Sequence, residues 1–161
     1  MTEVERIDSS LDEVRKRITF ETPQTGLVLG SGLVSFADTL DDGKSVAFAD
    51  VPGIPAAHVA GHAGNLVFGR CHGRPVVAMQ GRVHLYEGHD VRDVVFGVRW
   101  MIRAGAKTVV LTNAAGGIDA TLRVGDLMVL DDHLNLTGRN CLTGPNEDAL
   151  GVRFVDMTTA Y

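Results

Sequence analysis

The sequence has few cysteines, no long apolar run and no excess of positive charge, and each shortage excludes a class of protein. Its two cysteines, Cys71 and Cys141, share no short spacing, so neither a disulfide framework nor a zinc site is predicted and a reducing compartment fits. The chain carries 15 Lys and Arg against 20 Asp and Glu, which argues against a surface for nucleic acid. Small-molecule chemistry is therefore the expected role.

The absence of long apolar runs argues against a membrane protein. No stretch approaches ~18 consecutive apolar residues, and the N-terminus is charged from its third residue, unlike a secretion signal. We therefore expect a soluble, cytoplasmic protein without a membrane partner. Of its 161 residues 45% are hydrophobic, enough to bury a core, and with no repeat or linker in sight the chain is predicted to form one domain over residues 1–161.

Hydrophobic spacing predicts an α/β fold with a mixed central sheet flanked by helices. Apolar residues three and four apart predict amphipathic helices at 3–18 and 91–105, the second ending at Gly105. Short apolar runs predict strands at 26–30, 45–51, 107–112 and 126–130, and an antiparallel pair at 65–71 and 74–80 around His72-Gly73. Strand, helix and strand in succession predict a right-handed parallel crossover.

A polar cluster follows the apolar run of the second hairpin strand, and residues 80–90 read QGRVHLYEGHD. If the chain stays extended there, the two-residue period places Arg82, His84 and Tyr86 on one side. A guanidinium fork, an imidazole and a phenol together suit a phosphate or carboxylate. On this stretch alone, a solvated strand end with a local ion pair is an equally good interpretation.

Three small-residue loops add candidate anion-binding groups. The sequence reads LGSGL at 29–33, where glycine N–H groups and the Ser31 hydroxyl can surround an anion. It reads TNAAGG at 112–117, after a predicted strand, and GHAG at 61–64, which holds His62. Taken singly, each is more often an ordinary turn or surface loop. No histidines have the spacing of a metal site, so no metal is assigned.

The order of the motifs resembles the purine nucleoside phosphorylase family in its homotrimeric form. Residues 26 to 161 contain, in order, GLVLGSGL, PGIP, GHAGNLVFG, VVAMQGRVHLYEGH, VLTNAAGGI, VGDLMVLDDHLNLTG, GPN and GVRFVDM. Members of the family are longer, so the resemblance implies a nucleoside phosphorylase-like fold whose C-terminal part is missing. It also implies that the sheet ends in an unpaired edge with exposed apolar surface.

The resemblance implies a reaction and a site. The reaction is reversible cleavage of purine ribonucleosides or deoxyribonucleosides by phosphate to a free base and (deoxy)ribose 1-phosphate, in purine salvage. Inorganic phosphate is a co-substrate and no cofactor is expected. The implied phosphate ligands are Ser31, His62, Arg82, His84 and the N–H of Ala114, with Arg82 and His84 as the catalytic pair. Tyr86 is implied to contact the ribose, and Phe154 to enter the ribose site of a neighbouring subunit in a homotrimer.

Two alternatives stay open at this stage. The chain can be a truncated, non-catalytic phosphate-binding fragment or trimer partner, because the family's base-binding residues lie beyond Tyr161. It can also resemble methylthioadenosine phosphorylase, which shares the fold, although NAAGG favours the purine nucleoside enzyme. The purine preference is not readable from these residues.

Overall fold

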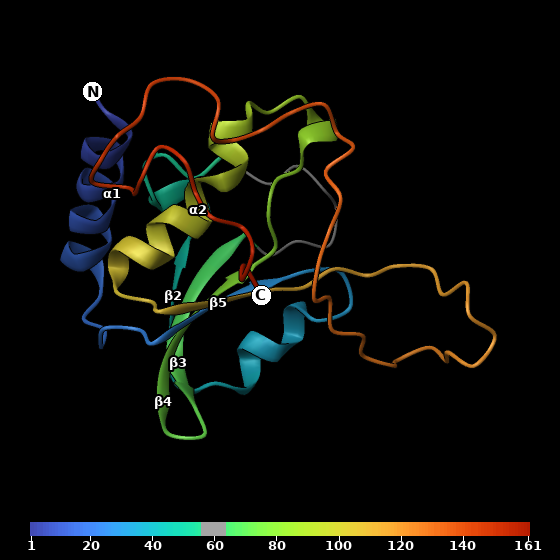
Figure 1. Ribbon diagram of the computed structural model, residues 1–161. Helices are drawn as coiled ribbons and strands as arrows, with labels where there is room; N and C mark the ends of the chain where they lie inside the picture. The colour runs from blue at the N-terminus through green and yellow to red at the C-terminus, as the bar shows by residue number, and fades with distance from the viewer. Residues whose placement is uncertain (56–63) are drawn as a thin grey trace.

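The computed structural model describes residues 1–55 and 64–161, in which a five-stranded sheet carries two helices (Figure 1). The helices are α1 (Glu3–Arg17) and α2 (Val91–Ala104), and the strands are β1 (Thr25–Leu29), β2 (Asp41–Ala47), β3 (Asn65–Cys71), β4 (Arg74–Gln80) and β5 (Thr108–Leu111). Three short 3-10 helices are η1 (Val34–Thr39), η2 (Phe48–Asp50) and η3 (Leu85–Glu87). Among the described residues, the last strand or helix is β5.

The sheet is mixed, as the sequence predicts, with the strand order β2-β3-β4-β1-β5. Strand β1 pairs in parallel with β4 and β5, while β3 pairs antiparallel with β2 and β4. The β3–β4 hairpin turns at His72 and Gly73, whose φ angles are 48° and 75°, as a tight two-residue turn requires. Helix α2 connects β4 to β5, which run in the same direction on either side of β1, so the predicted parallel crossover is present.

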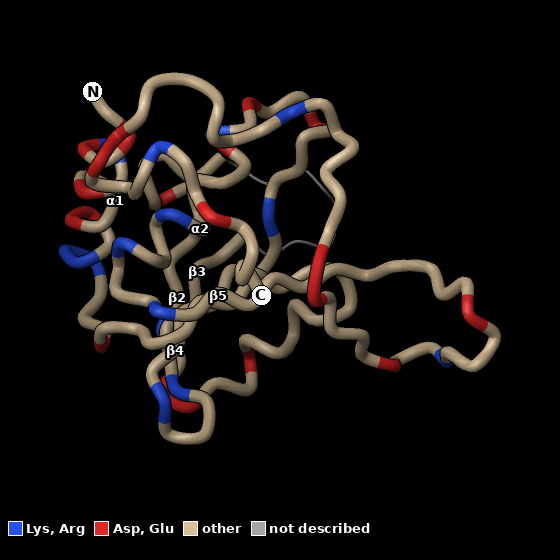
Figure 2. The backbone as a smooth tube through the Cα atoms, in the orientation of Figure 1, with Lys and Arg blue, Asp and Glu red and all other residues tan. Residues whose placement is uncertain are grey.

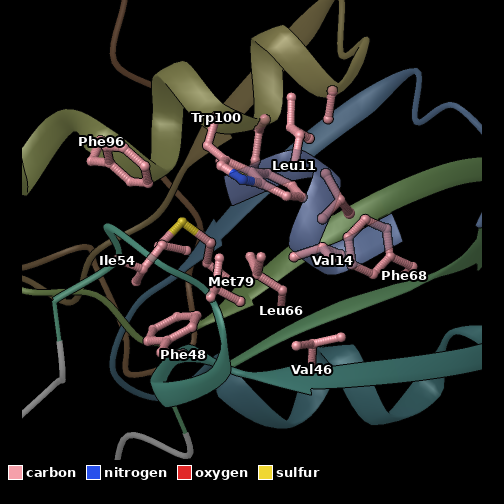
Figure 3. Packing of buried hydrophobic residues seen from close by; sticks show 14 of the residues in the cluster. Leu11, Val14, Val46, Phe48, Ile54, Leu66, Phe68, Met79, Phe96 and Trp100 are labelled. Carbon is pink, nitrogen blue, oxygen red and sulfur yellow. The ribbon is translucent and has the colours of Figure 1, made fainter. Parts of the chain in front are cut away.

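The two helices cover one face of the sheet, and η1 covers the other. Strand β4 shows the two-residue period: Val77 and Met79 belong to the cluster that holds the helices, and Val76 and Ala78 to the cluster that holds Ala37 of η1. The helical side contains the larger side chains. Figure 3 shows several of them, among them Leu11, Val14, Leu66, Phe68, Met79, Phe96 and Trp100.

Both helices begin and end where local chemistry favours it. Thr2 and Glu5 form a reciprocal capping box at the start of α1, which satisfies backbone donors that the helix leaves unpaired. Asp90 caps α2 through the N–H of Arg92, and Gly105 follows its last turn with φ of 126°. The predicted helices at 3–18 and 91–105 are confirmed to within a residue or so at each end.

Two predicted strands differ from the structure. The prediction of a strand at 45–51 has the wrong bounds, because β2 runs from Asp41 to Ala47 and Phe48–Asp50 form η2. The first five residues of β2 are exposed, so this edge strand has no apolar pattern to announce its start. The prediction of a strand at 126–130 is wrong, since these residues have no strand partner and no buried face. Their apolar side chains are at least half exposed.

Residues 112–161 form no helix or strand, and part of this segment runs well away from the sheet (Figure 1). Strand β5 is the last strand of the order, so one of its edges pairs with no described strand. Leu111 in β5 is 66% exposed and Val124 farther on is 109% exposed. The expected unpaired edge with exposed apolar surface is therefore present.

Candidate functional site

The site is built at the carboxyl ends of three parallel strands. Strands β4, β1 and β5 are neighbours in that order and run in the same direction. Their carboxyl ends therefore meet at one edge of the sheet, which is where open α/β sheets bind ligands. The segments that leave this edge are Gly30–Leu33, Gly81–His84 and Thr112–Ala114, and these segments hold most of the candidate residues.

Gly30 is the point at which the three strand ends touch. A Cβ atom placed on this buried residue would lie 2.4 Å from Nη1 of Arg82 and 2.6 Å from the carbonyl oxygen of Thr112. It would also lie 3.1 Å from Cα of Asn113. The missing side chain is thus what lets the Arg82 guanidinium approach the backbone of β1.

The Arg82 guanidinium is incompletely satisfied. Its Nη1 atom is buried and, within the described parts of the chain, has no hydrogen-bond partner. A buried cationic donor without an acceptor is costly, so this position favours an anion that brings oxygen atoms to the guanidinium.

The chain after β1 forms a tight turn suited to the same anion. The Gly30 carbonyl accepts a hydrogen bond from the N–H of Leu33 at 3.0 Å, and Gly32 has φ of 85°. Ser31 and Gly32 are exposed at the apex, and none of the hydrogen bonds among described residues uses their N–H groups. Consecutive free N–H groups at a glycine turn form a concave anion site.

The segment after β4 is extended only as far as His84. Val83 is buried between Arg82 and His84, but Leu85–Glu87 form η3, so the expectation that the two-residue period continues to Tyr86 is wrong. The turn is stabilised by Glu87, whose carboxylate accepts the His84 N–H at 2.7 Å. Tyr86 nevertheless reaches the same neighbourhood: its ring stacks on the His84 imidazole, with ring centroids 4.7 Å apart.

The remaining candidate residues differ in how near they lie to the strand ends. Ala114 is exposed directly after Asn113, whose amide bonds its carbonyl oxygen, so it lies beside the Gly30 contact. Phe154 is 89% exposed in the C-terminal segment, and no ring contact among described residues joins it to the strand ends. His62 lies outside the described residues.

Comparison with known proteins identifies the family. Residues 24–161 match the family model described as the phosphorylase superfamily. The chain belongs to the phosphorylase superfamily. Purine nucleoside phosphorylase 1 of Geobacillus stearothermophilus is 49% identical over 140 residues, which are 87% of this chain and 51% of that protein. Purine nucleoside phosphorylase 1 of Bacillus subtilis is 44% identical over 157 residues, 98% of this chain and 58% of that protein.

Solved structures of the superfamily show the same fold. A purine nucleoside phosphorylase in complex with ribose-1-phosphate has a TM-score of 0.89 and 38% identity, over 100% of this chain and 60% of that one. The Schistosoma mansoni purine nucleoside phosphorylase in complex with inosine has a TM-score of 0.88 and 37% identity, over 100% of this chain and 57% of that one. The mixed sheet flanked by helices is thus confirmed as a phosphorylase fold, and this chain spans about half to three-fifths of its relatives' length.

Three polar residues near the strand ends have structural roles that the sequence did not predict. Glu87 caps η3, as above. Gln80 is 6% exposed and links β4 to η1 through a bond from its amide to Asp38 at 2.9 Å. The Thr112 hydroxyl joins β5 to β1. The bonds of Gln80 and Thr112 join distant segments and leave no local pattern in the sequence, although Gln80 is detectable as a polar residue that ends an apolar strand.

The chain also has a hollow that lies away from this edge of the sheet. This hollow of about 740 Å³ lies between α1, α2 and residues 141–155, and none of the candidate residues lines it. We place the site at the strand ends because the buried Arg82 Nη1, for which no partner exists among the described residues, is there. No group of three potential metal ligands occurs within the described part. None of its helices has the length and apolar content that a membrane span needs. Acidic residues predominate in the first turns of α1, and basic residues gather in its last turn (Figure 2).

Proposed function

We propose that this chain carries the phosphate-binding part of an active site that cleaves purine ribonucleosides or deoxyribonucleosides with inorganic phosphate. The products are the free base and (deoxy)ribose 1-phosphate. The observation that carries the proposal is the buried Arg82 Nη1, which has no hydrogen-bond partner in the part of the chain that the structure describes, beside a glycine turn at the shared strand edge. The relatives support the choice of substrate, because those named above are purine nucleoside phosphorylases and one structure holds ribose-1-phosphate.

In the proposed site, phosphate takes its hydrogen bonds from several segments. Arg82 provides the guanidinium, the turn after β1 provides the Ser31 hydroxyl, and β5 is followed by the Ala114 N–H. His84 and His62 complete the proposed set as imidazole donors. Each fixed donor of this kind contributes about 2.7–4 kcal/mol when charge develops in a transition state.

The proposed reaction needs no covalent intermediate with the protein. A phosphate oxygen forms a bond to C1′ of the sugar while the C1′–N bond breaks, and the electron pair of that bond leaves with the purine, which takes up a proton. Because C1′ becomes cation-like as the base departs, a phosphate held as an anion beneath it stabilises the transition state. Arg82 and His84 are the proposed catalytic residues. The Tyr86 ring, 77% exposed and stacked on His84, is the proposed wall for the ribose.

The proposal also covers the oligomeric state and the place of the reaction in the cell. The largely exposed Phe154 ring supports a homotrimer in which it enters a neighbouring subunit's ribose site. We further propose a single domain that acts in cytoplasmic purine salvage without a cofactor.

The test combines calorimetric titration with phosphate and an assay for phosphate-dependent release of hypoxanthine from inosine. We expect Arg82→Ala to abolish both signals. The matched control is Arg74→Ala, which changes an exposed arginine at the start of β4, a strand's length from Arg82. Phosphate binding without hypoxanthine release would identify a phosphate-binding fragment. Absence of both signals from the unmodified chain would refute the proposal.

A further inference from the structure

The hydroxyl of Thr112 forms a bridge between the ends of β1 and β5. It accepts the N–H of Gly30 at 2.8 Å and donates to the carbonyl of Val28 at 2.9 Å. The backbone N–H of Thr112 also donates to the Val28 carbonyl, at 3.0 Å. Both hydrogen-bonding capacities of the hydroxyl are therefore used, and both partners belong to the chain that leads into the phosphate turn.

The bridge replaces a rung of the sheet. Val28 pairs with Leu111 and its carbonyl accepts the Thr112 N–H, so the evenly spaced bonds of a parallel ladder would continue from the Gly30 N–H to the backbone carbonyl of Thr112. Here the side-chain oxygen of Thr112 takes that N–H. The orientation of the Gly30 N–H is thus set by a side chain. It therefore depends on which amino acid occupies position 112, whereas a backbone hydrogen bond would form with almost any residue there.

The backbone of Gly30 is held on both sides. Its N–H is bound by Thr112, and the Gly30 carbonyl is bound by the N–H of Leu33 at 3.0 Å. Between these two bonds lie Ser31 and Gly32, whose N–H groups no described residue accepts. The Arg82 guanidinium lies against the same Gly30.

We propose that Thr112 is a positioning residue, whose hydroxyl holds the Gly30–Leu33 turn at the spacing from Arg82 that phosphate requires. The inference rests on the proposed function, since it assigns a role in the same phosphate site. Thr112 acts through Gly30 and needs no contact with phosphate itself. Valine at position 112 keeps the shape of the side chain and removes the bridge, whereas serine keeps the hydroxyl and loses only a methyl group.

The experiment compares Thr112→Val, Thr112→Ser and Thr108→Val in the full chain. Thr108 is an exposed residue at the start of β5, the strand that leads into Thr112, and its side chain forms no described hydrogen bond. Calorimetry with inorganic phosphate measures the affinity of each folded variant. We expect Thr112→Val to weaken phosphate binding about tenfold, the effect of leaving one buried donor unpaired. Thr112→Ser and Thr108→Val are expected to stay within about twofold of the unmodified chain.

A second measurement separates positioning from general stability and does not depend on the valine variant's folding. In amide NMR spectra of the unmodified chain, we expect added phosphate to move the resonances of Ser31 and Gly32 while Gly30 stays protected from hydrogen exchange. A Gly30 amide that exchanges freely, or that moves most on adding phosphate, would overturn the inference.

The outcomes distinguish this inference from the proposed function. If the unmodified chain binds no phosphate, both fail. If it binds phosphate and loses it in Arg82→Ala but not in Thr112→Val, the proposed function stands and the bridge is refuted. If Thr112→Val and Thr108→Val weaken binding equally, the effect belongs to β5 as a whole and the inference is again refuted.

Discussion

Replacing Gly30 by alanine tests the geometry of the strand ends. The backbone of Gly30 does not have the positive φ angle that disfavours alanine, so the substitution acts through space rather than through backbone strain. Its Cβ would lie 2.4 Å from Arg82 Nη1 and 2.6 Å from the Thr112 carbonyl oxygen. A Cβ atom essentially never lies closer than 3.0 Å to another heavy atom, so both neighbours must retreat to at least that distance.

The size of the effect follows from what has to move. The Thr112 carbonyl belongs to the backbone that pairs with β1, so we expect a loss of unfolding free energy of about 1–3 kcal/mol, the usual cost of overpacking. The guanidinium is on a flexible side chain and moves more readily. Its displacement removes a charge-assisted hydrogen bond to phosphate, worth about 1.5–3 kcal/mol, which is about a 10- to 150-fold loss of affinity.

The assay is urea denaturation together with phosphate titration of the folded variant. Gly43→Ala is the control, because a Cβ at Gly43 in β2 would meet its nearest neighbour, the Leu40 carbonyl, at an ordinary 3.4 Å. We expect Gly43→Ala to keep phosphate affinity within about twofold. A folded Gly30→Ala variant with unchanged phosphate affinity would refute the contact between Gly30 and Arg82 as the basis of the site.

Three further predictions concern the packing that supports this edge. Ser10→Ala leaves the buried Trp100 Nε1 without its 3.0 Å partner, so urea denaturation should show about 1–3 kcal/mol lower stability; an unchanged midpoint would contradict this. Gln80→Leu removes bonds to Asn65 and to η1, with a similar expected loss, and retention of full stability would show that these bonds contribute nothing. The pKa of Glu147 is lowered, chiefly because its carboxylate accepts the first two N–H groups of α1. This attachment is therefore complete above the unfolded pKa of about 4.3 and is lost as pH falls through the lower folded pKa. Hydrogen exchange at residues 141–155, corrected for intrinsic rates, should rise in that acidic range, and an equal rise in Glu147→Gln would refute the assignment.

Sequence reasoning recovered the elements whose signals are local. The helices have strong apolar periodicity and recognisable caps in Thr2, Asp90 and Gly105. Strands β1, β3 and β4 are short apolar runs, because both faces of the sheet are covered there. The first half of β2 was not predicted because β2 is an exposed edge strand. Its residues are extended because they pair with β3 and not because they are buried.

The site was partly predictable for a related reason. Arg82 and His84 follow an apolar strand, and Ser31 stands in a glycine turn, so residue type and place on the strand ends indicated them. The structure adds what sequence cannot encode locally: the closeness of Arg82 to Gly30, which depends on β4 and β1 being neighbours across about fifty residues of chain. The family resemblance predicted which loops meet, and the contact at Gly30 gives the physical reason.

The failed strand at 126–130 shows the limit of pattern reading. Its composition is that of a buried strand, yet Leu127 and Val129 are 86% and 91% exposed. A strand forms when its backbone finds hydrogen-bonding neighbours and one face finds a core, and the described chain offers this segment neither. The solved relatives of similar fold are longer by two-fifths or more of their length. Apolar sequence thus records a requirement for burial, and whether that burial occurs depends on which other segments are present.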